Sequence, residues 1–160
     1  MSELSHLDEE GAARMVDVGA KESTARSAVA VGTLYSTTEV LGLLASGGLP
    51  KGDTLATARV AGVMGAKRTA DLVPLCHSVG LSSVDVEFVT GEYSIQVRAV
   101  AHTTGPTGVE MEALTAVHVA ALTLHDMIKA VDPAATLEGV YLERKEGGRS
   151  GSWQHPRTAQ

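Results

Sequence analysis

The chain has 160 residues, 44% of them hydrophobic and 20% charged, which predicts one globular domain with a single core. Its 19 acidic and 13 basic residues give a formal charge of −6, and only three Tyr, one Trp and one Phe are present, which argues against a nucleic-acid-binding surface. The single cysteine, Cys76, excludes an internal disulfide framework, a cysteine-rich zinc site and a three-cysteine iron–sulfur centre.

The two ends of the chain differ in composition from the middle. Residues 1–14 and 147–160 are rich in small, polar and charged residues without periodicity, so we expect flexible ends around one folded domain at 15–146. The N-terminus has no apolar run behind a basic start, and no stretch is long enough to span a membrane. With the lone cysteine, these features predict a cytoplasmic protein that acts without a membrane.

The first half of the domain predicts a strand followed by two helices. Residues 27–35 are compact and β-prone, and they stop at a run of candidate helix caps, Ser36-Thr37-Thr38. Residues 39–45 predict a short helix that Ser-Gly-Gly closes. Asp53 then caps a longer helix that continues to residue 72 and is rich in small residues.

The second half predicts a hairpin, a long helix and a last strand. Residues 84–89 and 94–102 alternate in polarity around a turn, and a loop leads from them to an uninterrupted helical pattern at 109–131. A final strand is expected at 137–144. The order β-α-α-β-β-α-β predicts an α+β, ferredoxin-like fold, with an antiparallel sheet that carries its helices on one face.

Two sides of the long helix are apolar. One stripe is spaced to meet the sheet: Leu114, Val117, Ala121, Leu124, Ile128 and Val131. The opposite side carries small or apolar residues and two isolated carboxylates, Glu112 and Asp126, where a water-facing helix would carry many charges. We expect a second subunit or a substrate to cover this side. The alternative cover is the small-residue helix of the same chain.

Asp126 and Lys129 are three residues apart and therefore neighbours on this helix. An exposed ion pair is the simpler interpretation of that spacing. Glu112 lies 14 residues earlier, which places it about 21 Å away along the axis, too far for one small substrate to contact both residues. If all three residues are catalytic, the site takes residues from two chains.

Several other patterns give weaker signals. Residues 62–69 lack the Gly before Lys that a nucleotide-binding phosphate loop requires. His118 and His125 are about 10.5 Å apart along the helix, too far to share a metal ion, so no metal site is predicted. Four basic residues have two possible interpretations, as solvated surface charges or as groups that neutralise a phosphorylated substrate. They are Arg26, Lys51, Lys67 and Arg68.

Several separate motifs in the right order resemble one known family. They are Lys51-Gly52-Asp53, AKRTADLVPLCH at 66–77, TGVEMEALTA at 107–116 and AALTLHDMIKAVD at 120–132, and the likeness covers residues 14–152. The chain resembles the MoaC family, the cyclic pyranopterin monophosphate synthases of molybdenum cofactor biosynthesis. Two positions depart from the family pattern: Ser78 stands where Pro is frequent, and Pro106 where a basic residue is frequent.

The resemblance implies a lyase without a cofactor of its own. Such an enzyme converts 3′,8-cyclo-7,8-dihydro-GTP, made by a radical S-adenosylmethionine enzyme, to cyclic pyranopterin monophosphate and diphosphate. It also implies a homohexamer, built as a trimer of dimers with sites at subunit boundaries. The alternative function is a non-catalytic regulatory module that binds a small ligand, because ferredoxin-like domains frequently do only that.

The resemblance also assigns site residues. Asp126 and Lys129 would form the central catalytic pair, with Lys51 beside them. The substrate-binding positions would be Leu75, Cys76, His77, Met111 and Glu112, with Glu110 close by. As a separate hypothesis, the triphosphate would be neutralised by Arg26, Lys67 or Arg68.

Overall fold

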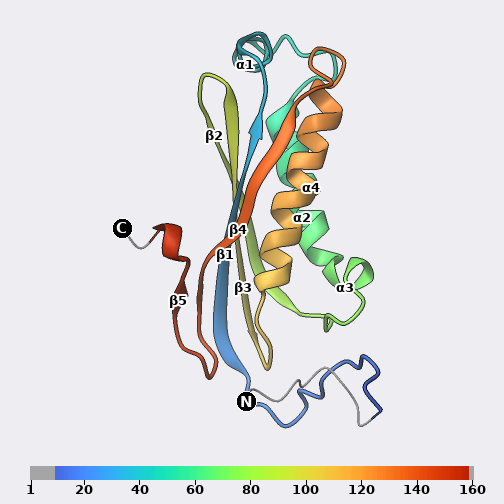
Figure 1. Ribbon diagram of the computed structural model, residues 1–160, viewed down its shortest axis with the longest axis vertical. Helices are drawn as coiled ribbons and strands as arrows, with labels where there is room; N and C mark the ends of the chain where they lie inside the picture. The colour runs from blue at the N-terminus through green and yellow to red at the C-terminus, as the bar shows by residue number, and fades with distance from the viewer. Residues whose placement is uncertain (1–9, 159–160) are drawn as a thin grey trace.

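The computed structural model describes residues 10–158, and its helices lie on one face of an open sheet (Figure 1). The elements are β1 (Thr24–Tyr35), α1 (Thr38–Ser46), α2 (Thr54–Lys67), α3 (Thr69–Leu72), β2 (Leu81–Thr90), β3 (Ser94–Gly105), α4 (Glu110–Ile128), β4 (Thr136–Glu146), β5 (Trp153–Gln154) and a 3-10 helix at Pro156–Thr158. The sheet order is β2-β3-β1-β4-β5, with every neighbouring pair antiparallel. The predicted α+β, ferredoxin-like fold is confirmed.

The central strands present small or branched apolar residues to the helices. On β3, every second residue from Ile95 to Ala101 is completely buried, as a half-covered sheet requires. Gly32 on β1 pairs with Val97, and a Cβ at Gly32 would come within 2.9 Å of the Val117 side chain on α4. The missing side chain therefore lets α4 lie close to the middle of the sheet.

The side of α4 that faces away from the sheet is covered by α2 of the same chain. A Cβ added to Gly62 would lie 3.0 Å from the Ala116 carbonyl oxygen, and one added to Gly65 would lie 2.7 Å from a Val119 methyl group. The expectation that a second subunit or a substrate covers this side was therefore wrong. The alternative, the small-residue helix, holds because its glycines permit close helix contact.

The predicted helix signals form the expected contacts. Thr37 accepts a hydrogen bond from the Val40 N–H at the start of α1, and Asp53 accepts one from the Ala56 N–H at the start of α2. The predicted helix at 54–72 breaks at Arg68 into α2 and α3. At this break the Thr69 hydroxyl donates to the Ala66 carbonyl, a side-chain bond that competes with the helical backbone pattern.

The C-terminal segment contains structure that the sequence pattern does not predict. β5 pairs with the end of β4, with Gln154 opposite Arg144. A two-residue strand is too short to produce a recognisable alternation. Residues 1–9 and 159–160, which belong to the ends predicted to be flexible, lie outside the described residues. Across residues 10–158, no helix has the length and apolar character needed to cross a membrane.

Candidate active site

Lys51, Asp126 and Lys129 form an ion-pair cluster at the C-terminal end of α4. Lys51, on the loop between α1 and α2, donates from Nζ to Asp126 Oδ2 at 2.6 Å and to the Asp126 carbonyl oxygen at 2.9 Å. Lys129, at the end of α4, places its Nζ 2.7 Å from Asp126 Oδ1. The carboxylate thus fixes two ammonium groups, one on each of its oxygens.

The cluster is open to solvent and strongly polarised. The three side chains are 41–54% exposed, so a ligand can reach them. Hydrogen bonds from Lys129 and then Lys51 lower the pKa of Asp126 from 3.8 to about 2. Asp126 is therefore ionised at neutral pH. Two cations around one anion leave a net positive charge that suits a developing oxyanion.

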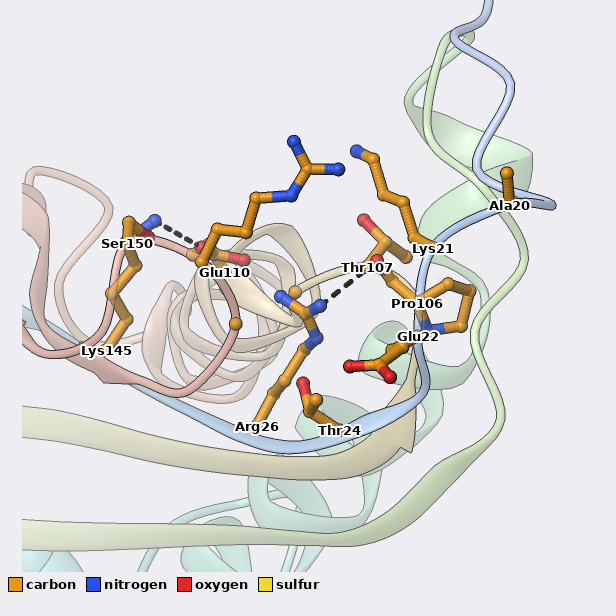
Figure 2. Close-up of a pocket in the computed structure, with 13 residues that line it drawn as sticks. Ala20, Lys21, Glu22, Thr24, Arg26, Pro106, Thr107, Glu110, Lys145 and Ser150 are labelled. Atoms are coloured by element: carbon orange, nitrogen blue, oxygen red, sulfur yellow. Dashed lines mark hydrogen bonds and ion pairs between the residues drawn. The ribbon is translucent and has the colours of Figure 1, made fainter.

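A cleft of about 720 Å³ lies at the opposite end of the domain, near the start of α4 (Figure 2). Four basic side chains line it, and two acidic ones: Lys21, Arg26, Lys145 and Arg149, with Glu22 and Glu110. The basic groups outnumber the acidic groups in a protein whose overall charge is −6. This local excess of positive charge is typical of a site for a polyanion.

Contacts within the chain hold two of the basic groups of the cleft, Arg26 and Lys145, in place. Arg26 donates from Nε to the Gly105 carbonyl and from Nη2 to the Pro106 carbonyl. Gly148 has a φ of +70°, and a Cβ there would collide with the Arg26 guanidinium. Lys145 forms an ion pair with Glu110 at 3.0 Å, which a dashed line marks on one side of the cleft in Figure 2.

His77, Cys76 and Glu112 are also placed toward the start of α4. His77 lines a smaller pocket of about 160 Å³, which shares Pro106 and Thr107 with the cleft, and its Nε2 lies 2.6 Å from the Val16 carbonyl oxygen. Glu112 is buried, and burial followed by the nearby Glu110 charge raises its pKa. Burial and then the Glu112 charge raise the pKa of the Cys76 thiol, which argues against a thiolate nucleophile.

The predicted site residues therefore form two groups at opposite ends of α4. Glu112 and Asp126 stand on the same helix, and 14 residues separate them by about 21 Å. In Figure 1 the C-terminal end of α4 lies at the same end of the molecule as α1, whereas its N-terminal end follows the loop after β3 at the other end. Within one chain, the two groups do not form one small-molecule site.

Comparison with known proteins identifies relatives over almost the entire chain. The model of the MoaC family matches residues 15–148. The chain belongs to the MoaC family. It is 60% identical over 151 residues to cyclic pyranopterin monophosphate synthase 2 of Mycobacterium tuberculosis, covering 94% of this chain and 90% of the relative. It is 53% identical over 161 residues to the cyclic pyranopterin monophosphate synthase of Chloroflexus aggregans, covering 99% and 98%.

Four further predicted residues of this MoaC chain have less defined places. Leu75 and Met111 are exposed apolar side chains, at 38% and 39%. Lys67 and Arg68 are exposed at the end of α2, and neither lines the cleft. Of the three basic residues considered for triphosphate neutralisation, the structure places Arg26 alone in the cleft.

Three of the cleft cations of this MoaC chain are not among the residues expected from its sequence: Lys21, Lys145 and Arg149. Lys21 precedes β1, and Arg149 follows a Gly-Gly pair, so both stand in irregular segments that show no periodic pattern. Lys145 reaches the cleft because a β-bulge in β4 changes which face its side chain lies on. The available signal was the run Gly147-Gly148-Arg149-Ser150-Gly151, which lies within residues 14–152, the part of the chain that resembles the family.

Proposed function

We propose that this chain is a cyclic pyranopterin monophosphate synthase of molybdenum cofactor biosynthesis. It acts as a lyase that converts 3′,8-cyclo-7,8-dihydro-GTP to cyclic pyranopterin monophosphate and releases diphosphate. The observation that carries the proposal is the pair of charged sites on a chain of this family: a basic cleft and a Lys-Asp-Lys cluster. A non-catalytic ligand-binding module would not need both.

The basic cleft suits the triphosphate. Arg26 has two of its nitrogens bound to backbone carbonyls, which orients the guanidinium, while Lys145 and Arg149 approach from β4 and the loop after it. Planar guanidinium groups bind phosphate oxygens through paired hydrogen bonds. The adjoining pocket with His77 has room for part of the ring system. Glu112 lies in the first turn of α4, and its raised pKa suits a group that takes part in proton transfer.

The Lys51–Asp126–Lys129 cluster suits the ring rearrangement. That reaction requires proton transfers and stabilisation of developing negative charge rather than redox chemistry. Asp126 remains a carboxylate and holds both ammonium groups, which donate protons or stabilise oxyanions. The radical step that makes the substrate belongs to a separate S-adenosylmethionine enzyme, and this chain works in the cytoplasm without a cofactor.

The separation of the two groups along α4 supports a site shared by two chains. The cluster of one copy would face the cleft of another, in keeping with the hexamer, a trimer of dimers, that the family resemblance implies. The apolar side of α4 that faces away from the sheet does not support a shared site, because α2 of the same chain covers it.

Mixed oligomers test both the activity and the shared site. We expect Lys51→Ala, and separately Arg26→Ala/Lys145→Ala, to lose at least about 99% of diphosphate release from the cyclic triphosphate. Co-assembly of the two in equal amounts should restore about one quarter of the wild-type activity, because a quarter of shared sites then receive both intact halves.

The matched control is a mixture of Lys51→Ala with Lys129→Ala. These residues lie in the same cluster, so no mixed site is intact and no activity should return. If the first mixture stays inactive although the variants fold and co-assemble, the shared site is refuted. If the wild type releases no diphosphate, the chain is the non-catalytic module instead.

A further inference from the structure

The loop that carries Arg149 into the cleft is rich in glycine, and the Gly151 N–H donates to the Gly148 carbonyl at 3.2 Å within it. Residues 147–152 connect β4 to β5, and Arg149 and Ser150 line the cleft. Three glycines in the loop have positive φ: Gly147, Gly148 and Gly151. Glycine loses more conformational entropy on folding than any other residue, so a fixed conformation of this loop is costly. Because glycine leaves many other conformations open to this loop, contacts at its ends help to hold Arg149 in the cleft.

An aromatic stack fastens the chain just beyond that loop. The ring of His155 lies 4.6 Å from the ring of Tyr141 on β4, and Trp153 meets His155 edge-on at 5.9 Å. The Arg157 guanidinium lies over the Tyr141 ring, 5.9 Å from its centroid. Contacts of this kind stabilise a structure beyond the area that they bury.

Hydrogen bonds extend the same attachment. The His155 N–H donates to the Glu143 carbonyl at 2.8 Å, which continues the ladder between β4 and β5 by one residue. The Arg157 N–H donates to His155 Nδ1 at 3.1 Å. The imidazole thus contacts the Tyr141 ring of β4, and its Nδ1 accepts a hydrogen bond from the 3-10 helix.

The β4 register connects this attachment to the cleft. Tyr141 pairs with Val31, and Lys145 pairs with Ala28, so the register shift between these pairs places the two side chains on opposite faces of the sheet. The stack therefore lies on the face away from the helices, while Lys145 faces Glu110 and the cleft. β4 therefore carries both Lys145, which faces the cleft, and Tyr141, which anchors the segment after loop 147–152.

We propose that the Tyr141–His155 stack holds loop 147–152 so that Arg149 contacts the phosphates of the substrate. Tyr141 and His155 are positioning residues, since they act through Arg149 and lie outside the cleft. The identity of the substrate rests on the proposed function, whereas the effect of the stack on phosphate affinity does not.

Binding of inorganic triphosphate to the full chain, measured by calorimetry, tests the role of the stack. Tyr141→Ala and His155→Ala should each weaken binding roughly fivefold, because Arg149 loses its fixed position. Tyr141→Phe keeps the ring and should bind like the wild type. The matched control is Tyr93→Ala, which removes a tyrosine exposed to 55% near the β2–β3 turn and should change nothing.

A double-mutant cycle shows whether the effect passes through Arg149. In an Arg149→Gln background, Tyr141→Ala should cause less than about a twofold further loss, because coupled residues are not additive. A full fivefold loss in that background, or unchanged affinity in both alanine variants, would overturn the proposal. Deletion of residues 153–160 replaces Tyr141→Ala if the latter does not fold, and it should weaken binding to the same degree.

Turnover separates this inference from the proposed function. With the cyclic triphosphate, the stack variants should raise KM roughly fivefold and leave kcat within about twofold of the wild type, since the Lys-Asp-Lys cluster is untouched. A loss confined to kcat would contradict the positioning role. Weaker triphosphate binding together with an inactive wild type would refute the proposed function and leave the stack's role intact.

Discussion

Asp126 determines where both lysines of the cluster lie. Its two carboxylate oxygens each bind one ammonium group, and its own backbone carbonyl accepts a second bond from Lys51. Because the group is exposed, solvent screens these attractions, and the geometry matters more for function than for stability. The low pKa of Asp126 and the high pKa of Glu112 come from opposite environments, since one carboxyl faces cations and the other is buried beside an anion.

The pKa of Asp126 yields a prediction at the scale of one residue. A carboxyl whose pKa falls from 3.8 to about 2 on folding stabilises the fold above pH 3.8, and this contribution is lost as the pH falls toward 2. Carbon-detected NMR titration should place the Asp126 midpoint near 2 in the wild type and higher in Lys129→Ala. An Asp126 midpoint near 3.8 in the wild-type protein would contradict the bidentate geometry.

At the scale of elements, the α2–α4 contact decides which side of α4 is covered. Gly62 of α2 lies against the Ala116 backbone and the Ala120 side chain of α4, and Gly65 lies against the Val119 side chain. Each glycine costs helix propensity of about 1 kcal/mol relative to alanine, so its presence reflects the close approach rather than helix formation. This contact leaves the charged end of α4 free for the cluster with Lys51.

Substitution of these glycines tests the contact. Gly65→Ala should lower the free energy of unfolding by about 1–3 kcal/mol, because its Cβ would lie 2.7 Å from Val119 and force the helices apart. Gly42→Ala on α1 is the matched control, since nothing lies within 4 Å of its Cβ and alanine favours the helix. Denaturant titration measures both. Equal stabilisation by the two substitutions would exclude tight packing at Gly65.

At the scale of the whole molecule, the basic cleft and the Lys-Asp-Lys cluster lie near opposite ends of α4. Figure 1 shows that this helix runs along much of the length of the sheet. A single chain carries the basic cleft near one end of α4 and the Lys-Asp-Lys cluster at the other. Pairing of copies would bring one of each together, and it would use neither the sheet-facing side of α4 nor the side that α2 already fills.

Dilution tests this arrangement. If the site needs two chains, specific activity should fall toward zero below the concentration at which sedimentation velocity shows dissociation. Restoration of the concentration should restore the activity, which distinguishes dissociation from irreversible loss. A dissociated monomer with full specific activity would refute the shared site, whatever the reaction proves to be.

The sequence alone determined the order of the main elements, the cap at Asp53, the run of residues that holds the cap Thr37, and family membership, because caps, periodicity and motifs are local properties of the chain. It also indicated the Asp126–Lys129 neighbours through helical spacing. The family resemblance also placed Lys51 beside that pair, and the tertiary structure supplies the contact, a hydrogen bond across 75 positions. Only the tertiary structure decided between α2 and a second subunit as the cover of α4, and only it brought Lys145 and Arg149 together with Arg26 in one cleft. Those contacts depend on close packing, a β-bulge and glycine turns, and none of these has a period that a linear pattern can reveal.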